Sequence, residues 1–421
     1  MQHMISGRDI IIISSIEWSF LWQGPQEMAS RLAGAGNRVL YMENTGVRSP
    51  KLSDVRRVAS RVVRWATTLA SNGLQTVAPN LHVCSPMVLP PFGGASRREL
   101  NRRVFLPMVC RAATSLQMRD PVLLTFLPTD TVVDLIQLLR SQAAVVVYYC
   151  AADFAELSSR PLHIAKSERE LLALSDLVLA QCSSLASHCS RWSNNVHIIP
   201  YGVNLEVFAP QDSASATKDQ DTRRTGNAAD LTRPIIGYIG GLHKHVDVPL
   251  LTAMAEARPH WSWVCIGPTQ TPLGRLAALP NVQLRGEFQH TELAQHIERF
   301  DVGIVPYVSS VFTNTVVPTK VNEYLAMGKA VVSTALPAVC DYPLWRGIVV
   351  TAEPHPESFI AAIEQALALP TDEVAKAHRR KVAALSDWQA RLEQISDLIG
   401  AAIETKSNQA ELVPQRKSAS A

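Results

Sequence analysis

At 421 residues the chain is too long for one ordinary hydrophobic core, so we expect two or three domains, and two fit the pattern best. With 47% hydrophobic and 18% charged residues, the composition argues against a disordered chain and against a small disulfide-stapled secreted module. The formal net charge of +3 is unremarkable, and we expect no nucleic-acid partner.

The seven cysteines are scattered, and no two of them are separated by only two residues. This spacing predicts buried thiols in a reducing compartment and no metal site. The apolar run Ile10–Ile13 lies between Asp9 and Glu17, so it indicates a strand and not a secretion signal. Because no run approaches the ~20 apolar residues of a membrane helix, we expect a cytoplasmic protein, either soluble or peripheral at the inner face of the cell membrane.

The first half of the chain alternates apolar strands with helices. Strands are expected at 9–15, 38–44, 81–87, 121–128, 143–150, 177–182 and 196–202, and helices at 24–36, 96–118 and 129–140. Continuous apolar strands joined by helices predict a parallel sheet covered on both faces. We assign residues 1–208 to an N-terminal Rossmann-like domain.

A second domain follows a change in composition. Residues 209–233 lose large apolar side chains and all periodicity, which predicts a flexible linker. Strands are expected again at 235–241, 261–268, 282–286, 301–307, 330–334 and 347–352. We therefore assign residues 234–385 to a C-terminal Rossmann-like domain. We expect a helix over 386–403 to pack back on the first domain, and a disordered tail over 404–421.

The predicted fold class is therefore α/β, with two Rossmann-like doubly wound parallel-sheet domains facing across a cleft. Sheets of this kind bind ligands at the carboxyl ends of their strands. Fold alone leaves epimerases, ligases and binding proteins open, so the function has to come from particular residues.

The segment 317–334 reads as a loop, a helix and a buried strand. Thr319 is expected at the N-cap of this helix, whose amino terminus offers backbone amides and a positive dipole to a diphosphate. Lys320 and Glu323 share one helix face, so a cation near phosphate and a carboxylate near ribose hydroxyls can act on one nucleotide. From spacing alone, an intrahelical pair between Lys320 and Glu323 is the commoner explanation.

This segment resembles the donor-binding signature of the group 1 glycosyltransferases, which have the B-type fold. The matching positions are Pro318, Lys320, Glu323, Tyr324, Leu325, Ala326, Gly328 and Lys329. The resemblance implies that Glu323 holds the donor ribose and that the anomeric configuration is retained. Thr315 stands where the family usually has a second glutamate that contacts the sugar. This departure puts sugar selection and the details of the retaining mechanism in doubt.

Two further segments resemble this family. The run 194–210 is similar to its interdomain segment, although by itself it is equally explained as a strand and turn. After the next expected strand, Gly240 and Gly241 let a phosphate approach the backbone, and Lys244 is positioned to reach that phosphate. The resemblance implies that Lys244 neutralises the leaving diphosphate. The histidines beside Lys244 lack a carboxylate or cysteine partner at metal-ligand spacing, so we predict no metal and no cofactor.

Residues of the first domain are less informative. Trp18 and Gly24 belong to a loop on the acceptor side, where Trp18 either stacks on a sugar or simply packs in the core. Asp153 ends a strand and resembles an acid found there in some family members. It is expected either to accept a proton from the acceptor hydroxyl or to cap a helix.

Basic residues concentrate between Arg48 and Arg119. Arg57, Arg61 and Arg64 fall on one side of a predicted amphipathic helix, which suits an anionic membrane surface, although an ordinary solvated helix is almost as good an explanation.

We therefore predict transfer of a hexosyl group from a nucleotide-diphosphate sugar to a glycan or lipid-linked glycan acceptor in surface polysaccharide biosynthesis. The alternatives are a sugar-nucleotide epimerase of the same fold and a catalytically silent sugar-nucleotide-binding protein. The absence of an acid at Thr315 motivates the silent alternative.

Overall fold

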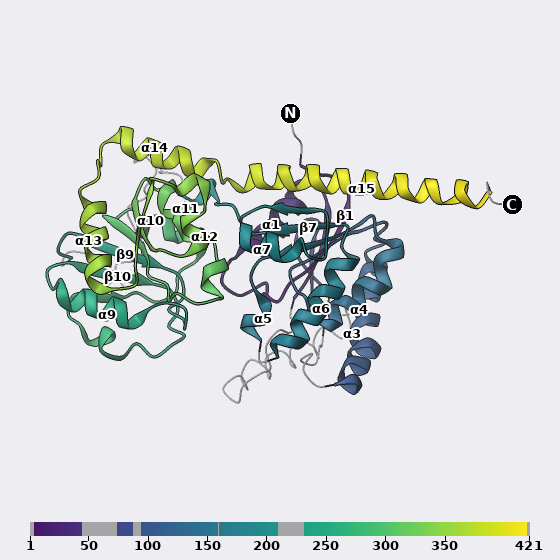
Figure 1. The fold of residues 1–421 in the computed structure, drawn as a ribbon, viewed down its shortest axis with the longest axis horizontal. Coiled ribbons are helices and arrows are strands. Elements are labelled where there is room, and N and C mark those ends of the chain that lie inside the picture. Colours follow the sequence, from purple (N-terminus) through teal and green to yellow (C-terminus); the bar gives the residue numbers. More distant parts are fainter. Residues whose placement is uncertain (1–3, 44–73, 87–93, 159, 209–230, 419–421) are drawn as a thin grey trace. The chain divides into compact units, whose positions relative to one another are not determined.

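The computed structural model describes residues 4–43, 74–86, 94–158, 160–208 and 231–418 (Figure 1). Within it, the chain forms two compact units. The first unit contains Met1–Pro200 and Arg391–Ala421, and the second contains Tyr201–Ala390. Most of the predicted linker, residues 209–230, lies outside the described residues, as do Arg57, Arg61 and Arg64.

The first unit is built on an eight-stranded sheet with the order β3-β4-β2-β1-β5-β6-β7-β8. Its strands are β1 (Asp9–Ile13), β2 (Arg38–Met42), β3 (Leu74–Ala78), β4 (Leu81–Cys84), β5 (Val122–Thr125), β6 (Val145–Cys150), β7 (Leu177–Ala180) and β8 (Val196–Ile198). Neighbouring strands are parallel, except that β3 pairs with β4 in the antiparallel direction. Strand β3 was not predicted. A tight turn at Asn80, whose φ is 60°, joins it to β4.

Helices of the first unit pack on this sheet and on one another. They are α1 (Gly24–Gly34), α3 (Ala95–Ser115), α4 (Asp130–Leu139), α5 (Phe154–Leu157), α6 (Pro161–Leu174) and α7 (Ser183–Cys189). Helix α4 packs between α3 and α6, whereas α1 contacts β2 and β4 (Figure 1). The core between the layers includes the fully buried run Ile10–Ile13 and the strand β6.

The second unit has a six-stranded, entirely parallel sheet with the order β11-β10-β9-β12-β13-β14. Its strands are β9 (Ile235–Ile239), β10 (Ser262–Ile266), β11 (Val282–Leu284), β12 (Val302–Val305), β13 (Ala330–Thr334) and β14 (Val349–Ala352). The strand order reverses between β9 and β12. The carboxyl ends of these two strands are therefore where a sheet of this topology binds ligands. The prediction of two doubly wound sheets is confirmed.

The helices of the second unit include two pairs that pack against each other. The helices are α8 (Leu205–Phe208), α9 (Val248–Ala257), α10 (Leu293–Ile297), α11 (Thr319–Ala326), α12 (Pro337–Cys340), α13 (Pro356–Leu367) and α14 (Glu373–Ala384). Helix α9 packs against α13, and α11 packs against α14 (Figure 1).

The boundary of the first unit differs from the predicted one. Residues 201–208 were assigned to the first domain, but they belong to the second unit, where Phe208 is fully buried and its ring lies 5.2 Å from that of His290. Just after this boundary the chain passes close to the start of α15, since a Cβ on Gly202 would lie 2.8 Å from the backbone of Trp388. Only a glycine leaves room for this approach.

The C-terminal tail also differs from the prediction. Helix α15 runs from Trp388 to Ser418, so residues 404–418 are helical and not disordered as predicted. Two contacts within the first unit hold this helix: Ser396 Oγ accepts a hydrogen bond from Ile5 N at 3.0 Å, and Lys406 Nζ donates to Ala143 O at 2.9 Å. The contact of Lys406 anchors the helix beyond residue 404. The polar composition of this segment predicted a disordered tail and gave no sign of that contact. No helix in the described part of the chain is long and apolar enough to span a membrane.

Candidate functional site

Helix α11 begins at the carboxyl end of the second sheet and carries most of the predicted motif. Thr319 was predicted as its N-cap, but Pro318 occupies that position with an extended ψ of 112°, and its carbonyl accepts a hydrogen bond from Val321 N at 3.1 Å. The helix is therefore displaced by one residue from the prediction, and Thr319 is its first residue. Its first turn still presents backbone N–H groups and the positive end of the helix dipole.

Lys320 does not make the intrahelical pair that its spacing suggested as the commoner outcome. Its ammonium donates to Tyr307 Oη at 2.6 Å and to Tyr238 Oη at 3.4 Å, and Nζ lies 4.8 Å from the centre of each ring. Burial alone would lower the pKa of Lys320. The two phenols, with a smaller effect of Glu323, outweigh burial and raise the pKa of Lys320 above its ordinary value, so Lys320 is a cation at neutral pH.

Glu323 lies one turn further along α11 and is largely buried, with 14% of its side chain exposed. Its Oε1 lies 3.8 Å from His290 Nε2. The ring of His290 meets that of Phe208 edge to face. The carboxylate is thus held beside an imidazole contributed by the segment that leads into α10.

Gly240 and Gly241 follow β9 and lie next to Lys320. Gly240 has a φ of 114°, and a Cβ there would lie 3.1 Å from Lys320 Nζ. A side chain at this position would therefore be strained and would crowd the ammonium. Gly241 O accepts a hydrogen bond from Tyr238 Oη at 3.0 Å, which ties the phenol to the same turn.

The other predicted residues of this unit lie close by in the chain but have different surroundings. Lys244 is exposed in the turn after Gly241, and its contact with a phosphate stays a prediction. Thr315 is half-buried, and its hydroxyl donates to Phe312 O at 2.8 Å. The position where the family usually has a glutamate thus holds a short side chain that bonds to its own loop.

In the first unit, Trp18 belongs to a loop that two buried polar residues hold in place. Trp18 N donates to Glu43 Oε2 at 2.6 Å, and Gln26 Nε2 donates to the carbonyls of Trp18 and Phe20, each at 3.3 Å. Gly24 is buried at the start of α1. Sequence reasoning missed Glu43, although a carboxylate directly after the apolar strand β2 was a usable signal.

Asp153 caps helix α5. Its Oδ1 accepts hydrogen bonds from Ala155 N at 3.1 Å and Glu156 N at 3.4 Å, which is the capping alternative left open by the sequence. This geometry alone does not assign Asp153 a catalytic role.

A buried carboxylate network lies in the same unit and was not predicted. Glu168 is 4% exposed and accepts hydrogen bonds from Tyr148 Oη at 2.6 Å and from His188 Nε2 at 3.1 Å. The hydrogen bond that His188 donates to Glu168 raises the pKa of His188, although burial acts in the opposite direction. No local pattern could have predicted this pair, because the two residues are on different helices.

This network predicts a pH-dependent contribution to stability. The pKa of His188 is raised in the folded state, so the contribution is fully present below the ordinary histidine value of 6.5 and is lost as the pH rises through the native value. We expect the melting temperature of wild type to exceed that of His188→Gln at pH 5.5, with the difference shrinking towards pH 9. Thermal scans across this range measure it. A difference that grows with pH would contradict the assignment.

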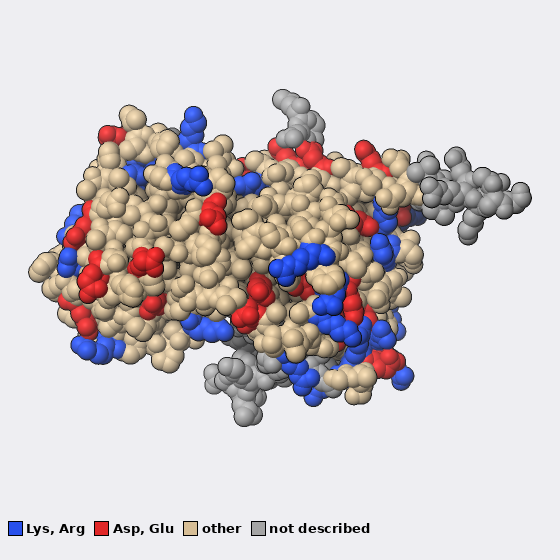
Figure 2. Space-filling view, viewed as in Figure 1, with Lys and Arg blue, Asp and Glu red and all other residues tan. Residues whose placement is uncertain are grey.

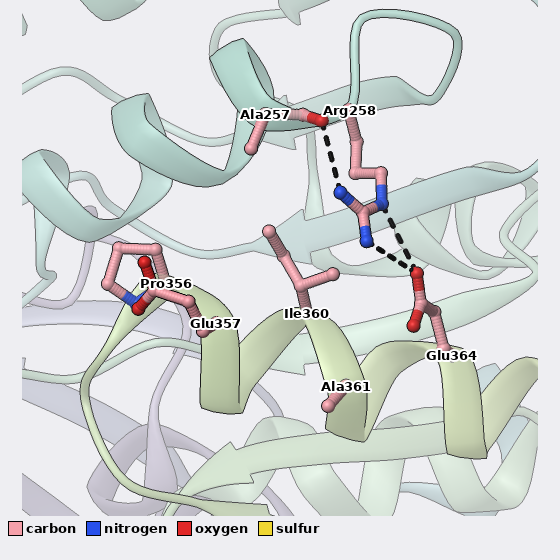
Figure 3. A pocket seen from close by; sticks show the side chains of 7 residues that line it. All are labelled: Ala257, Arg258, Pro356, Glu357, Ile360, Ala361 and Glu364. Carbon is pink, nitrogen blue, oxygen red and sulfur yellow. Dashed lines mark hydrogen bonds and ion pairs between the residues drawn. The ribbon is translucent and has the colours of Figure 1, made fainter.

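Two other features add nothing to the candidate site. Among the described residues, no group of three or more His, Cys, Asp or Glu side chains could hold a metal ion. A hollow between α9 and α13 is lined by Ala257, Arg258, Pro356, Glu357, Ile360, Ala361 and Glu364 (Figure 3). Arg258 pairs with Glu364 across it at 2.7 Å, and it contains no predicted site residue.

Part of the chain matches a known family and a curated relative. Residues 233–368 match the family model described as glycosyl transferases group 1. The chain is 29% identical over 272 residues to TuaH of Bacillus subtilis (strain 168), provisionally named a teichuronic acid biosynthesis glycosyltransferase. The match covers 61% of this chain and 66% of the relative, which is just under two thirds of its length.

Solved structures share the fold. Sucrose-phosphate synthase from Thermosynechococcus elongatus superposes with a TM-score of 0.70 at 17% identity, covering 94% of this chain and 100% of the other. Alr3699/HepE of Anabaena, solved in complex with UDP, gives 0.60 at 12% identity, with coverages of 94% and 100%. The B-type glycosyltransferase fold predicted from the sequence is confirmed.

Proposed function

We propose that the chain is a glycosyltransferase of the group 1 type, whose family model matches residues 233–368, and that it transfers a hexosyl group from a nucleotide-diphosphate sugar to a hydroxyl of a glycan or lipid-linked glycan. The observation that carries the proposal is the placement of Lys320 and Glu323. Lys320 is in the first turn of α11, beside Gly240 and near the carboxyl ends of the strands where the order of the second sheet reverses, and Glu323 follows one turn later on the same helix.

The chemistry follows from the charges at this place. When the bond between the sugar and the diphosphate breaks, negative charge grows on the leaving diphosphate. Lys320 stays protonated, and together with the amides of the first helical turn it would stabilise that charge where it develops. Glu323 would accept hydrogen bonds from the ribose hydroxyls and so orient the nucleotide. Lys244 would add a second cation from the turn after β9.

We further propose that the anomeric configuration is retained, by analogy with the family. Thr315 supplies no carboxylate, so at this position the chain offers only a hydroxyl to the sugar. Because protein cations would neutralise the leaving group, we also propose that transfer needs no divalent metal. Activity should then survive EDTA.

The acceptor proposal is supported by the name of the Bacillus relative, which assigns that protein provisionally to teichuronic acid biosynthesis. UDP-, GDP- and ADP-sugars should be assayed for nucleotide release, with membrane extract as the source of acceptor. Transfer predicts release that depends on the extract. Release of free sugar without acceptor would indicate an epimerase, whereas binding without turnover would indicate a silent protein.

We also propose that the first unit binds an anionic membrane surface from the cytoplasmic side. Figure 2 shows Lys and Arg side chains gathered over the part of the first unit that contains α3. On this helix, Leu100 and Val104 are 45% and 37% exposed and lie beside the exposed Arg97 and Arg103. Arg103 also pairs with the exposed Glu99 at 3.0 Å. Arg98 and Arg102 both hydrogen bond to Asp134 and serve the packing of α3 on α4.

Charge reversal tests the membrane proposal. Arg97→Glu combined with Arg103→Glu should weaken binding to vesicles of phosphatidylglycerol and phosphatidylcholine, measured by co-sedimentation, about 30-fold or more at low salt, because each cation near an anionic surface contributes ~1 kcal/mol. The same comparison should be made for Arg57, Arg61 and Arg64. Pure phosphatidylcholine vesicles are the control. Equal sedimentation of variant and wild type would make this basic region an ordinary solvated surface.

A further inference from the structure

Lys320 has two phenolic partners, and these partners are not equivalent. Tyr238 is fully buried on β9, and its hydroxyl proton is used by the carbonyl of Gly241, so its oxygen can only accept from Lys320. Tyr307 makes the shorter bond, at 2.6 Å against 3.4 Å for Tyr238. Tyr307 is therefore the stronger anchor of the ammonium.

Tyr307 is itself rigidly placed. It follows β12 directly, at the reversal point of the strand order, and it is 7% exposed. Its carbonyl accepts a hydrogen bond from Thr334 Oγ1 at 2.9 Å, and its backbone forms a bridge with Val246. These contacts tie Tyr307 to β13 and to the segment that follows Lys244, so the phenol offers a fixed acceptor.

We propose that Tyr307 is a positioning residue: its phenol orients the ammonium of Lys320 towards the diphosphate of the bound nucleotide. The inference rests on the proposed function of this site. A lysine side chain ordinarily has many rotamers, and ordering it on binding costs free energy. An ammonium has three N–H groups, and two of them donate to the phenols, which fixes the direction of the third. The cation is thus oriented before the ligand arrives.

The test is calorimetric titration with UDP, GDP and ADP, continued with the diphosphate that wild type binds most tightly and with the matching nucleoside. Tyr307→Phe keeps the ring but removes the acceptor. We expect this substitution to weaken the binding of the diphosphate about tenfold, the usual size for a hydrogen bond to a charged group, and to leave the binding of the nucleoside unchanged.

Tyr342→Phe is the matched control. Tyr342 is in the same unit and is also 7% exposed, and its hydroxyl is bonded to Ser386 Oγ at 3.1 Å. It should bind the diphosphate as wild type does. Thermal unfolding of both variants reports whether the second unit is intact. Loss of structure would also weaken the binding of the nucleoside.

A double-mutant cycle of Tyr307 and Lys320 separates the positioning role from the proposed function. If Tyr307 acts through Lys320, Tyr307→Phe has no further effect in a Lys320→Met background. A second tenfold loss in that background would overturn the positioning role and leave the role of Lys320 intact. If Lys320→Met binds the diphosphate like wild type, or if wild type binds none, the proposed function fails first and the positioning role fails with it.

Discussion

Glu323→Ala is expected to weaken the binding of the donor nucleotide about 100-fold, because in the proposed site this carboxylate accepts two hydrogen bonds from one ribose. Only 14% of the Glu323 side chain is exposed, so hydrogen bonds to it are shielded from competing water. His290, 3.8 Å from Oε1, limits the movement of the carboxylate. The fold should be preserved, since Glu323 is not part of the apolar face of α11.

Ligand substitution makes this prediction specific to the ribose. Wild type should prefer the ordinary nucleoside diphosphate over its 2′,3′-dideoxy form, and Glu323→Ala should bind the two equally. Glu364→Ala is the control, because it removes another paired carboxylate of the same unit and leaves α11 untouched. If Glu323→Ala retains the full preference for the ribose hydroxyls, Glu323 does not hold the ribose.

Local patterns were sufficient to predict the framework of the site. The apolar runs of β9, β12 and β13 and the stop at Gly328 are features of single segments, and the structure has them within a few residues of their predicted places. The spacing of Lys320 and Glu323 on one helix is equally local. These predictions succeeded because helical periodicity and continuous apolar runs depend only on residues that are close in the sequence.

The surroundings of these residues could not be predicted in the same way. Tyr238 meets Lys320 from 82 residues away, and Glu168 meets His188 across two helices. Such contacts depend on strand order, which the sequence does not state. From spacing alone an intrahelical pair was the commoner explanation for Lys320, and the structure does not form it. Tyr238 on β9 and Tyr307 just after β12 accept from the ammonium instead.

Two strand glycines explain how α11 reaches the sheet. Gly303 on β12 is the register partner of Gly237 on β9. A Cβ on Gly303 would lie 2.5 Å from the ring of Tyr324, and one on Gly237 would lie 2.0 Å from the ring of Phe300. The rings therefore occupy the space that two side chains would fill. Tyr324 Oη also accepts a hydrogen bond from Ile239 N at 2.9 Å, which fixes α11 to β9.

Gly303→Ala is expected to lower the free energy of unfolding by about 3 kcal/mol or more, because a methyl group cannot fit under a fully buried ring without displacing the helix. Displacement of Tyr324 would carry Lys320 and Glu323 with it, so nucleotide binding should be lost even where the chain remains folded. Urea unfolding measures the first effect, and calorimetric titration with the nucleoside diphosphate measures the second.

Gly400→Ala is the matched control. Gly400 is inside α15, and nothing lies within 4 Å of a Cβ added there. The same substitution should then raise the free energy of unfolding by up to about 1 kcal/mol, because alanine favours the helix. If Gly303→Ala unfolds at the urea midpoint of wild type and still binds nucleotide, the close approach of Tyr324 to β12 does not position α11, and the donor site must be supported in another way.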